Sequence, residues 1–322
     1  MHVLFIIDPI ESLKAYKDSS VAIMFALVAK GHSVSICYQA DIFIEQGQVQ
    51  AQTQAITVHP HADLHSQHWF ELVNMTRVLP LSAFAAVIMR KDPPFDMEYV
   101  YTTHLLDVAE QQGAQVFNRG VAIRNHPEKL SITEFSEFTA PTLVTRDMAR
   151  LKAFHEQHGD VVVKPLDGMG GTGVFRMGKV EPNRGAILEM LTHFGTQSIM
   201  AQRYIPEIVE GDKRVLIING EPVPYALARI PLAGETRGNL AAGGRGVAQP
   251  LNEHDMHVAR TIGAALAPRG LFLIGLDIIG KFVTEINVTS PTCFVEISEQ
   301  TDFDVSQFFV AMLEKTLHQR HQ

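Results

Sequence analysis

Cysteine is scarce in this sequence: only Cys37 and Cys293 occur among 322 residues. They are far apart, and no CxxC motif or Cys/His cluster accompanies either of them. Such usage favours free thiols in a reducing compartment, so we expect a cytoplasmic protein. We interpret Cys293 as a small buried hydrophobic residue rather than a nucleophile, because no basic partner lies near it in the sequence.

Long apolar runs are also missing. The run at residues 2–7 is interrupted by Asp8-Pro9 and is too short for the apolar core of a signal peptide. No window approaches the about 18 consecutive apolar residues of a membrane-spanning helix. We therefore expect no targeting segment and no membrane span.

An excess of positive charge is absent, since the formal net charge is −8. We therefore expect no general binding to nucleic acid or to anionic membranes. Any phosphate ligand must then be held by basic side chains placed locally. The loose histidine group has no spacing that fixes it to one face, and we interpret it as part of a polar surface loop; its members are His59, His61, His65 and His68.

The first β-α-β unit lacks a GxGxxG motif, which argues against dinucleotide binding. Residues 2–7 read as a buried strand, and 34–38 as the next one. Between them a helix is predicted, capped at Asp18 or Ser19 and stopped at Gly31. A parallel sheet covered by helices follows from this order.

A basic pair, Arg90-Lys91, ends the predicted strand at 85–90. Open α/β sheets bind ligands beyond the carboxyl ends of their strands, so this pair is a candidate for holding a substrate carboxylate. A solvated pair of loop charges is the alternative. Around this strand we expect an irregular β ribbon over 41–58, a helix over 97–112 and a strand over 114–117.

A glycine-rich loop at 167–173 follows a strand that delivers Lys164 at its end. Four glycines within the loop let the backbone approach a bulky anion and direct its N–H groups at phosphate oxygens. A strand rather than a helix comes next and GK[ST] is missing, so this is not a P-loop. A plain hairpin turn is the disfavoured alternative, because it needs fewer glycines.

Two arginines are predicted on adjacent antiparallel strands. Asn219-Gly220 is a strong hairpin signal between a strand that carries Arg214 and a strand that carries Arg229. The pair could clamp a transferring phosphoryl group, or it could be cross-strand charge facing solvent. The glycine-rich loop 231–246 then carries Arg237 and is predicted to be a mobile lid.

A hairpin at 277–291 carries three oxygen-bearing side chains: Asp277, Glu285 and Asn287. Glu285 and Asn287 share a face because they lie two residues apart on a strand. Asp277 joins that face only if the loop is one residue longer than Gly280-Lys281 or the strands contain a bulge. Two carboxylates and an amide oxygen suit Mg²⁺, which commonly bridges to phosphate. A solvated polar sheet face is the alternative.

Taken together, these stretches resemble the ATP-grasp superfamily and, more narrowly, the bacterial glutathione synthetases. The resemblance extends from about Asp8 to Pro291 and is carried by MRKDPPFD (89–96), KPLDGMGG (164–171), GDKRVL (211–216), ARIPLAGETRGNLAAGGRG (228–246) and LDIIGKFVTEINVTSPT (276–292). It implies an α/β (α+β) ATP-grasp fold with three domains: a Rossmann-like parallel domain (1–122), a small central α+β lobe (123–203) and a C-terminal antiparallel lobe (204–322), with ATP between the last two.

The resemblance also implies roles for individual residues. Those expected to bind ATP are Lys129, Lys164, Asp167, Gly168, Gly170, Gly171, Gln202, Tyr204, Ile205 and Asp212. Those expected to act on the transferred phosphoryl group and the acyl intermediate are Arg214, Arg229 and Arg237. Metal ligands would be Asp277, Glu285 and Asn287, and candidates for substrate contact are Asp18, Ser19, Arg90, Lys91, Arg237 and Ser290.

The activity implied is the joining of γ-glutamylcysteine to glycine with ATP and Mg²⁺, with Mn²⁺ as a substitute metal, by a homo-oligomer that is a tetramer in the family. A related ATP-grasp ligase acting on a peptide or protein C-terminus is one alternative. A non-catalytic ATP-binding module is another, but it should have lost Asp277, Glu285 or Arg214, and all three are present.

Overall fold

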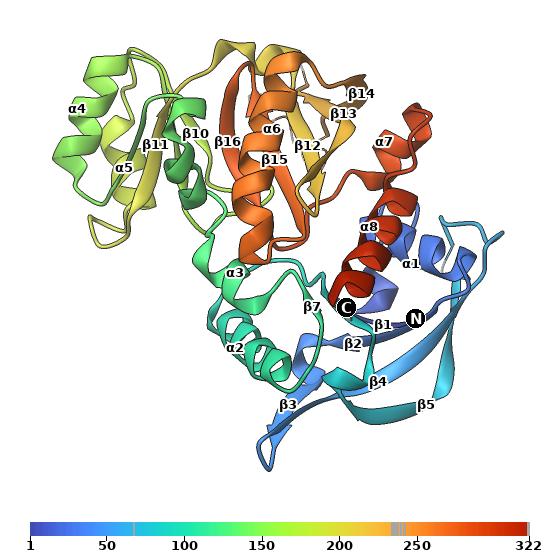
Figure 1. The fold of residues 1–322 in the computed structure, drawn as a ribbon. Coiled ribbons are helices and arrows are strands. Elements are labelled where there is room, and N and C mark those ends of the chain that lie inside the picture. The colour runs from blue at the N-terminus through green and yellow to red at the C-terminus, as the bar shows by residue number, and fades with distance from the viewer. Residues whose placement is uncertain (67, 233–237, 239, 241–242, 321–322) are drawn as a thin grey trace.

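The computed structural model describes residues 1–322 except 67, 233–237, 239, 241–242 and 321–322. Figure 1 shows three sheets, each with its own covering helices. Within the described residues, no helix combines the length and the apolar character needed to cross a membrane. Short 3₁₀ segments connect the elements at Ile10–Ser12, Gln39–Asp41, Leu81–Ala83, Leu130–Phe138, Pro206–Glu210 and Ala267–Arg269.

The first sheet has a parallel centre, as predicted. Its parallel strands are β1 (His2–Ile7), β2 (Ser33–Tyr38), β6 (Ala86–Met89) and β7 (Val116–Phe117). The predicted β ribbon is also confirmed, because β3 (Ile42–Glu45), β4 (Gln48–Val58) and β5 (Phe70–Pro80) pair antiparallel at the edge beyond β2. The covering helices are α1 (Ser19–Ala29), α2 (Met97–Gln111) and α3 (Gly120–Asn125).

Strand β1 shows why both faces of this sheet are covered. Successive side chains of a strand point to opposite faces. Val3, Phe5 and Ile7 belong to one buried cluster, whereas Leu4 and Ile6 belong to another. A run without polar alternation therefore fits a strand with helices on both sides.

The central lobe is a four-stranded antiparallel sheet in the order β10-β9-β11-β8. Its strands are β8 (Thr142–Thr145), β9 (Val161–Pro165), β10 (Phe175–Met177) and β11 (Ile199–Arg203), and its helices are α4 (Met148–His158) and α5 (Arg184–Leu191). Asp147 caps α4 by accepting hydrogen bonds from the N–H groups of Ala149 and Arg150. A small core of its own, around Leu151, Val163 and Ile199, holds this lobe together.

The third sheet is antiparallel in the order β14-β13-β12-β15-β16. Its strands are β12 (Asp212–Ile218), β13 (Glu221–Ile230), β14 (Arg245–Pro250), β15 (Leu273–Ile279) and β16 (Phe282–Asn287), with α6 (Glu253–Leu266) packed on it. The predicted hairpin at Asn219-Gly220 is confirmed: both residues have positive φ, 51° and 82°, as a tight turn between twisted strands requires.

The β15–β16 hairpin has the register predicted for a shared face. Asp277 lies opposite Glu285, whereas Ile279 lies opposite Phe282 across a loop of only Gly280 and Lys281. The extra residue is Thr284, which forms a bulge in β16. Of the two predicted solutions, the bulge is confirmed and the longer loop is wrong.

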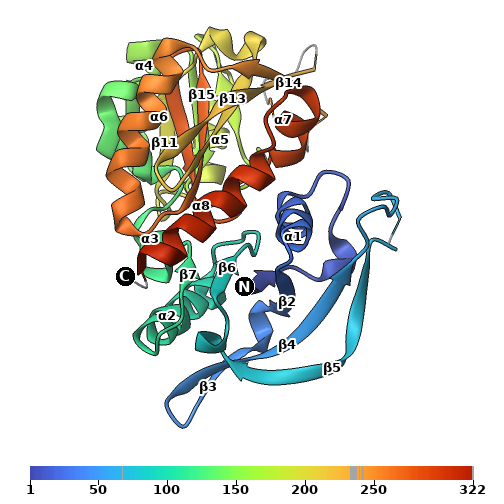
Figure 2. The same ribbon diagram turned by 45° about the vertical axis from the view of Figure 1, so that its right-hand side comes forward.

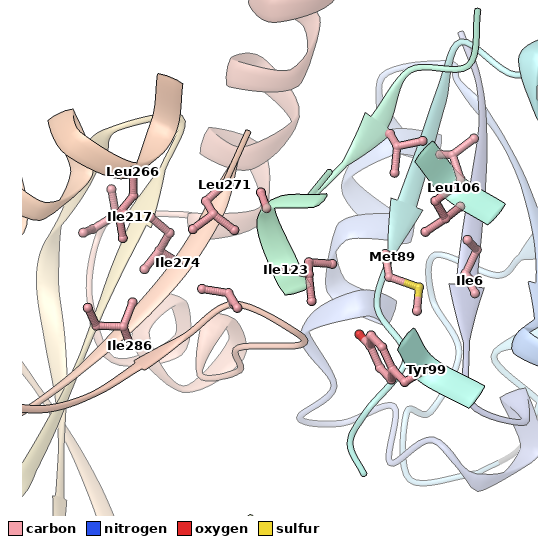
Figure 3. Close-up of a cluster of buried hydrophobic side chains, with 14 of the residues drawn as sticks. Ile6, Met89, Tyr99, Leu106, Ile123, Ile217, Leu266, Leu271, Ile274 and Ile286 are labelled. Atoms are coloured by element: carbon pink, nitrogen blue, oxygen red, sulfur yellow. The ribbon is translucent and has the colours of Figure 1, made fainter. Parts of the chain in front are cut away.

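The first and third sheets share one continuous core. Figure 3 shows Met89 and Tyr99 of the first domain on one side of this core. On the other side are Ile274 of β15 and Leu271, which precedes that strand, and Ile123 of α3 lies between the two sides. This packing fixes the first domain against the third sheet.

The chain ends on the first domain. Helices α7 (Phe294–Gln300) and α8 (Val305–Arg320) leave the third sheet, and α8 lies along α1 (Figure 2). Glu314 of α8 accepts hydrogen bonds at 2.8 Å from Lys30 and contacts His32 at 2.8 Å. The tail is helical and covers the first sheet.

Candidate active site

A cavity of about 730 Å³ opens where the three sheets meet. The first domain contributes the segment after β1 and residues near Asp92, and the central lobe contributes the glycine loop and residues 202–205. The third sheet contributes one face of β12, β13, β15 and β16. A volume of this size is typical of small-molecule sites.

One face of the third sheet carries its charged residues in rows. Arg214 lies opposite Asp277, and Asp277 lies opposite Glu285, so the three form a row across β12, β15 and β16. Asp212 lies opposite Arg229 on the neighbouring strand. Because directly opposite residues share a face, the pairing of the strands brings these side chains into one cavity.

Asp277 is the centre of a buried ion-pair network. Its carboxylate accepts hydrogen bonds from Arg214 Nε at 2.7 Å and Nη2 at 3.3 Å, and it lies 3.0 Å from Arg229 Nη2. Burial alone would raise the pKa of Asp277, but the two guanidinium groups outweigh burial and hold the pKa well below its usual range. Asp277 is therefore ionised throughout the physiological pH range.

Asp212 binds the other side of Arg229. Its Oδ2 accepts a hydrogen bond from Arg229 Nη2 at 2.6 Å, whereas its buried Oδ1 has no hydrogen-bond partner among the residues that the structure describes. Burial raises the pKa of Asp212, and Arg229 opposes that rise. An unpaired buried acceptor at a cavity wall is a group ready to bind a ligand.

The metal-ligand set predicted from the sequence lies on this same face. Asp277, Glu285 and Asn287 all line the cavity, and Asn287 donates its Nδ2 to Gly275 O at 3.1 Å, which leaves its side-chain oxygen as an acceptor. Hard oxygen atoms of this kind fit Mg²⁺. Among the residues that the structure describes, no three or more His, Cys, Asp or Glu side chains gather as a metal site; the predicted set has only two carboxylates.

Two lysines approach Glu285 from different parts of the chain. Lys129 Nζ lies 2.8 Å from Glu285 Oε1 and also donates to the carbonyl of Gly168 in the glycine loop. Lys164 Nζ donates to the carbonyl of the bulge residue Thr284 at 3.2 Å. Burial lowers the pKa of Lys164 to about 8. The bulge therefore sets the register of the hairpin and also accepts a hydrogen bond from Lys164, one of the residues predicted to bind phosphate.

The glycine loop covers the cavity between β9 and β10. Gly168, Gly170 and Gly171 line it, and Asp167 is not among the lining residues. Gly170 and Gly171 have φ of 62° and 81°, which favour glycine. A side chain at Gly168 would approach Pro165 to 2.8 Å, so the tight loop also needs glycine there.

Gln202, Tyr204 and Ile205 of the central lobe and the segment after it also line the cavity. Arg176 of β10 lies over the ring of Tyr204, 3.7 Å from its centroid, and makes two hydrogen bonds to Asp160 at 3.0 and 2.7 Å. Arg176 also lines the cavity but was not predicted. Its position comes from the pairing of β10 with β9, which no local pattern reveals.

The candidates for substrate contact divide into two groups. Asp18, the N-cap of α1, and Ser290, which donates to the carboxylate of Asp92, line the cavity. Ser19, Arg90 and Lys91 are not among the lining residues. Ser19 is buried and accepts from the N–H of Phe294, Arg90 donates to Ser20 Oγ at 2.9 Å, and Lys91 pairs with Asp8 at 2.8 Å. Arg237 lies outside the described residues.

Sequence reasoning missed several lining residues. Asp8 and Asp92 follow β1 and β6, so the strand-end rule that selected Arg90 could have selected them. Lys14 and Lys17 lie on the loop that leads to Asp18. Glu128 directly precedes Lys129 and had no signal of its own.

Comparison with known proteins identifies the family. Residues 1–124 match the family described as prokaryotic glutathione synthetase, N-terminal domain, and residues 128–302 match its ATP-grasp domain. The glutathione synthetase of Bordetella parapertussis is 66% identical over 314 residues, which cover 98% of this chain and 99% of the relative. That of Ralstonia nicotianae is 53% identical over 315 residues, which cover 98% of this chain and 96% of the relative.

Solved structures share the fold at low identity. The D-cycloserine synthetase DcsG superposes with a TM-score of 0.69 at 14% identity, covering 98% of this chain and 100% of its own. A RimK domain ATP-grasp protein from Sphaerobacter thermophilus superposes with a TM-score of 0.61 at 15% identity, covering 97% of this chain and 99% of its own. The fold and the family predicted from the sequence are thereby confirmed: this chain belongs to the prokaryotic glutathione synthetase family and has the ATP-grasp fold.

Proposed function

We propose that this chain joins γ-glutamylcysteine to glycine with consumption of ATP, through an acyl phosphate. The observation that carries the proposal is the buried network of Arg214, Asp277 and Arg229, placed in one cavity with Lys129 and Lys164. Cations held by buried carboxylates are rigid, and rigid cations are the main contribution expected for phosphoryl transfer. Membership of the family, in which the named relatives are glutathione synthetases, supports the substrates.

ATP would lie between the central lobe and the third sheet. Its adenine would occupy the end lined by Gln202, Tyr204 and Ile205, and its phosphates the end where Lys129, Lys164 and the glycine loop converge. Each lysine already contacts a main-chain carbonyl, so its ammonium group is oriented before the nucleotide arrives. Orientation of this kind lowers the entropic cost of binding.

Mg²⁺ would be held by Asp277, Glu285 and Asn287, and when bound it would neutralise charge on the phosphates. In this structure Glu285 is paired with Lys129 and Asp277 with the two arginines. These cations compensate the carboxylates, so the oxygen set is preformed.

The chemistry requires two displacements. A carboxylate oxygen of γ-glutamylcysteine would attack the γ-phosphorus, the bond to the bridging oxygen would break, and ADP would leave. The nitrogen of glycine would then attack the acyl carbon, phosphate would leave with the former carboxylate oxygen, and the nitrogen would lose a proton. Arg214 and Arg229 lie on the cavity wall where they would stabilise the charge on the phosphoryl oxygens.

The loop 231–246 would exclude water from the acyl phosphate, which water otherwise hydrolyses. Its described part lies against the network: a side chain at Gly238 would clash with the carbonyl oxygen of Arg229 and would approach Asp212 Cβ to 3.2 Å. Leu240 lines the cavity beside it. Arg237 remains the predicted contact to the intermediate.

The proposal is tested by phosphate release from ATP with purified protein. Release should require γ-glutamylcysteine, glycine and Mg²⁺ together, and mass spectrometry should find glutathione in equal amount. Mn²⁺ is expected to substitute for Mg²⁺. Omission of each component is the control. Turnover with another acyl donor or with a peptide C-terminus, and none with γ-glutamylcysteine, would overturn the assignment.

The pH dependence of nucleotide binding should report on Lys164. Its pKa of about 8 in the free protein means that the amine is charged at pH 7 and loses its proton as the pH rises through 8. Loss of one charge-assisted contact costs roughly tenfold in affinity. We therefore expect the Kd for ADP, measured by calorimetry, to rise about tenfold between pH 7 and pH 9.5.

Lys164→Arg is the control for that experiment, because a guanidinium group stays protonated over this range. The variant should bind ADP with a flatter pH profile. An equal rise of the Kd in the variant would assign the pH dependence to another group.

We further propose that the chain acts as a homo-oligomer, a tetramer, in the cytoplasm. The tetramer rests on the family resemblance, and the compartment is supported by two buried free cysteines. Light scattering after size-exclusion chromatography should give four times the mass of the chain.

A further inference from the structure

Glu128 is a partly buried cavity residue that the proposed chemistry does not use. Its Oε1 accepts three hydrogen bonds from the segment after β16: from the N–H of Val288 at 2.9 Å, the N–H of Thr289 at 3.1 Å and the hydroxyl of Thr289 at 2.8 Å. It lies between α3 of the first domain and Lys129. One carboxylate oxygen therefore holds two successive peptide groups of another domain.

The main chain of Glu128 extends this connection. Its carbonyl accepts a hydrogen bond from the N–H of Ile286 at 3.0 Å. Ile286 and Val288 flank Asn287, so Glu128 holds the strand on both sides of that residue. Asn118 of the first domain adds a third connection, because its Nδ2 donates to the carbonyl of Val288 at 2.8 Å.

The surroundings of Glu128 disfavour a charged carboxylate. Burial raises the pKa of Glu128 and the nearby Glu285 raises it further, whereas the three donors lower it. A carboxylate in such a place is stabilised by the three hydrogen bonds that its Oε1 accepts. Lys129, the next residue, contacts both Glu285 and the glycine loop. The dipeptide 128–129 thus connects the third sheet with the glycine loop of the central lobe.

We propose that Glu128 is a positioning residue, which sets the distance between Asn287 and Lys129 and thereby the affinity of the site for the magnesium–nucleotide complex. The inference rests on the proposed function, which places the metal at Asn287 and phosphate at Lys129. It concerns ligand binding, so it is measured apart from catalysis.

The experiment compares Glu128→Ala with Glu128→Gln. The alanine variant loses the acceptor for all three donors, and the Kd for ADP in saturating Mg²⁺ should rise by about 10- to 100-fold, as for residues that orient metal ligands. The glutamine variant keeps an oxygen in the same place and should stay within about threefold of the unmodified chain, because the amide oxygen preserves the geometry of the segment although each contact is about half as strong.

Asp107→Ala is the matched control. Asp107 also accepts a main-chain N–H, from Val121 at 2.8 Å, and pairs with Arg124, but it does not line the cavity. It should lower the melting temperature without changing the Kd for magnesium–ADP. If Glu128→Ala does not fold, Thr289→Val removes one of the three donors and should raise the same Kd by a smaller factor.

Three outcomes would overturn the inference. The first is a Glu128→Ala variant that binds magnesium–ADP normally, and the second is one that only melts earlier, as Asp107→Ala does. The third is a glutamine variant as defective as the alanine variant, which would assign the effect to charge. Binding that depends on Glu128 in a chain without ligase activity would support the inference and refute the proposed function.

Discussion

Asp277→Ala is expected to lose turnover by at least about 10³-fold and to lower the free energy of unfolding by about 3–5 kcal/mol. Asp277 is 5% exposed, and its carboxylate is the common partner of Arg214 and Arg229. Its removal leaves two buried guanidinium groups close together with less negative charge between them. Such uncompensated burial is among the largest effects of a single substitution.

Two measurements check this expectation. Chemical denaturation gives the free energy of unfolding, and a steady-state assay gives the turnover. Asp255→Ala is the matched control, because Asp255 is equally buried and pairs with Lys213 at 2.5 Å, but neither residue lines the cavity. It should be destabilised to a similar extent and keep the activity of its folded fraction. An Asp277→Ala protein with unchanged stability would show that the arginines find other partners.

Glu285→Gln should lower turnover without lowering stability. We expect a loss of about 10²–10³-fold in turnover and a melting temperature close to that of the unmodified chain. Glu285 is half-buried, and its partner Lys129 retains an amide oxygen to bind. The substitution removes one negative charge from the proposed metal site and little volume. Higher Mg²⁺ should restore part of the activity, because the remaining ligands bind the metal more weakly.

Glu314→Gln controls for the change of charge. Glu314 also lies 2.8 Å from a lysine ammonium group, on α8 and outside the cavity. Its variant should be fully active. Near-normal turnover of Glu285→Gln at ordinary Mg²⁺ would remove Glu285 from the metal site.

The hairpin at 277–291 shows what local sequence can predict. Alternation and the placement of oxygen-bearing residues demanded that Asp277 and Glu285 share a face, and the structure has that register through a bulge at Thr284. The Asp18 helix cap and the Asn219-Gly220 turn were predicted for the same reason: each depends on interactions within a few residues.

Which side chain at the end of a strand reaches the cavity could not be predicted. The strand-end rule placed Arg90-Lys91 at the correct edge, but Arg90 is held by Ser20 beneath the surface and Asp92 lines the cavity instead. The choice depends on packing between α1 and β6, which are distant in sequence. Glu128 was missed for the same reason, because its partners Val288 and Thr289 lie 160 and 161 residues away.

The position of α8 on α1 has a consequence for synthesis of the chain. Phe309 and Leu313 of α8 share a buried cluster with Met24 and Leu27 of α1, so the first domain needs the last helix to cover its sheet. During synthesis, residues 1–124 emerge from the ribosome long before α8 has been made. Domains usually fold in order from the N-terminus as they emerge. Here the first segment to emerge should remain incomplete, with apolar surface exposed to chaperones, until the final residues close the structure.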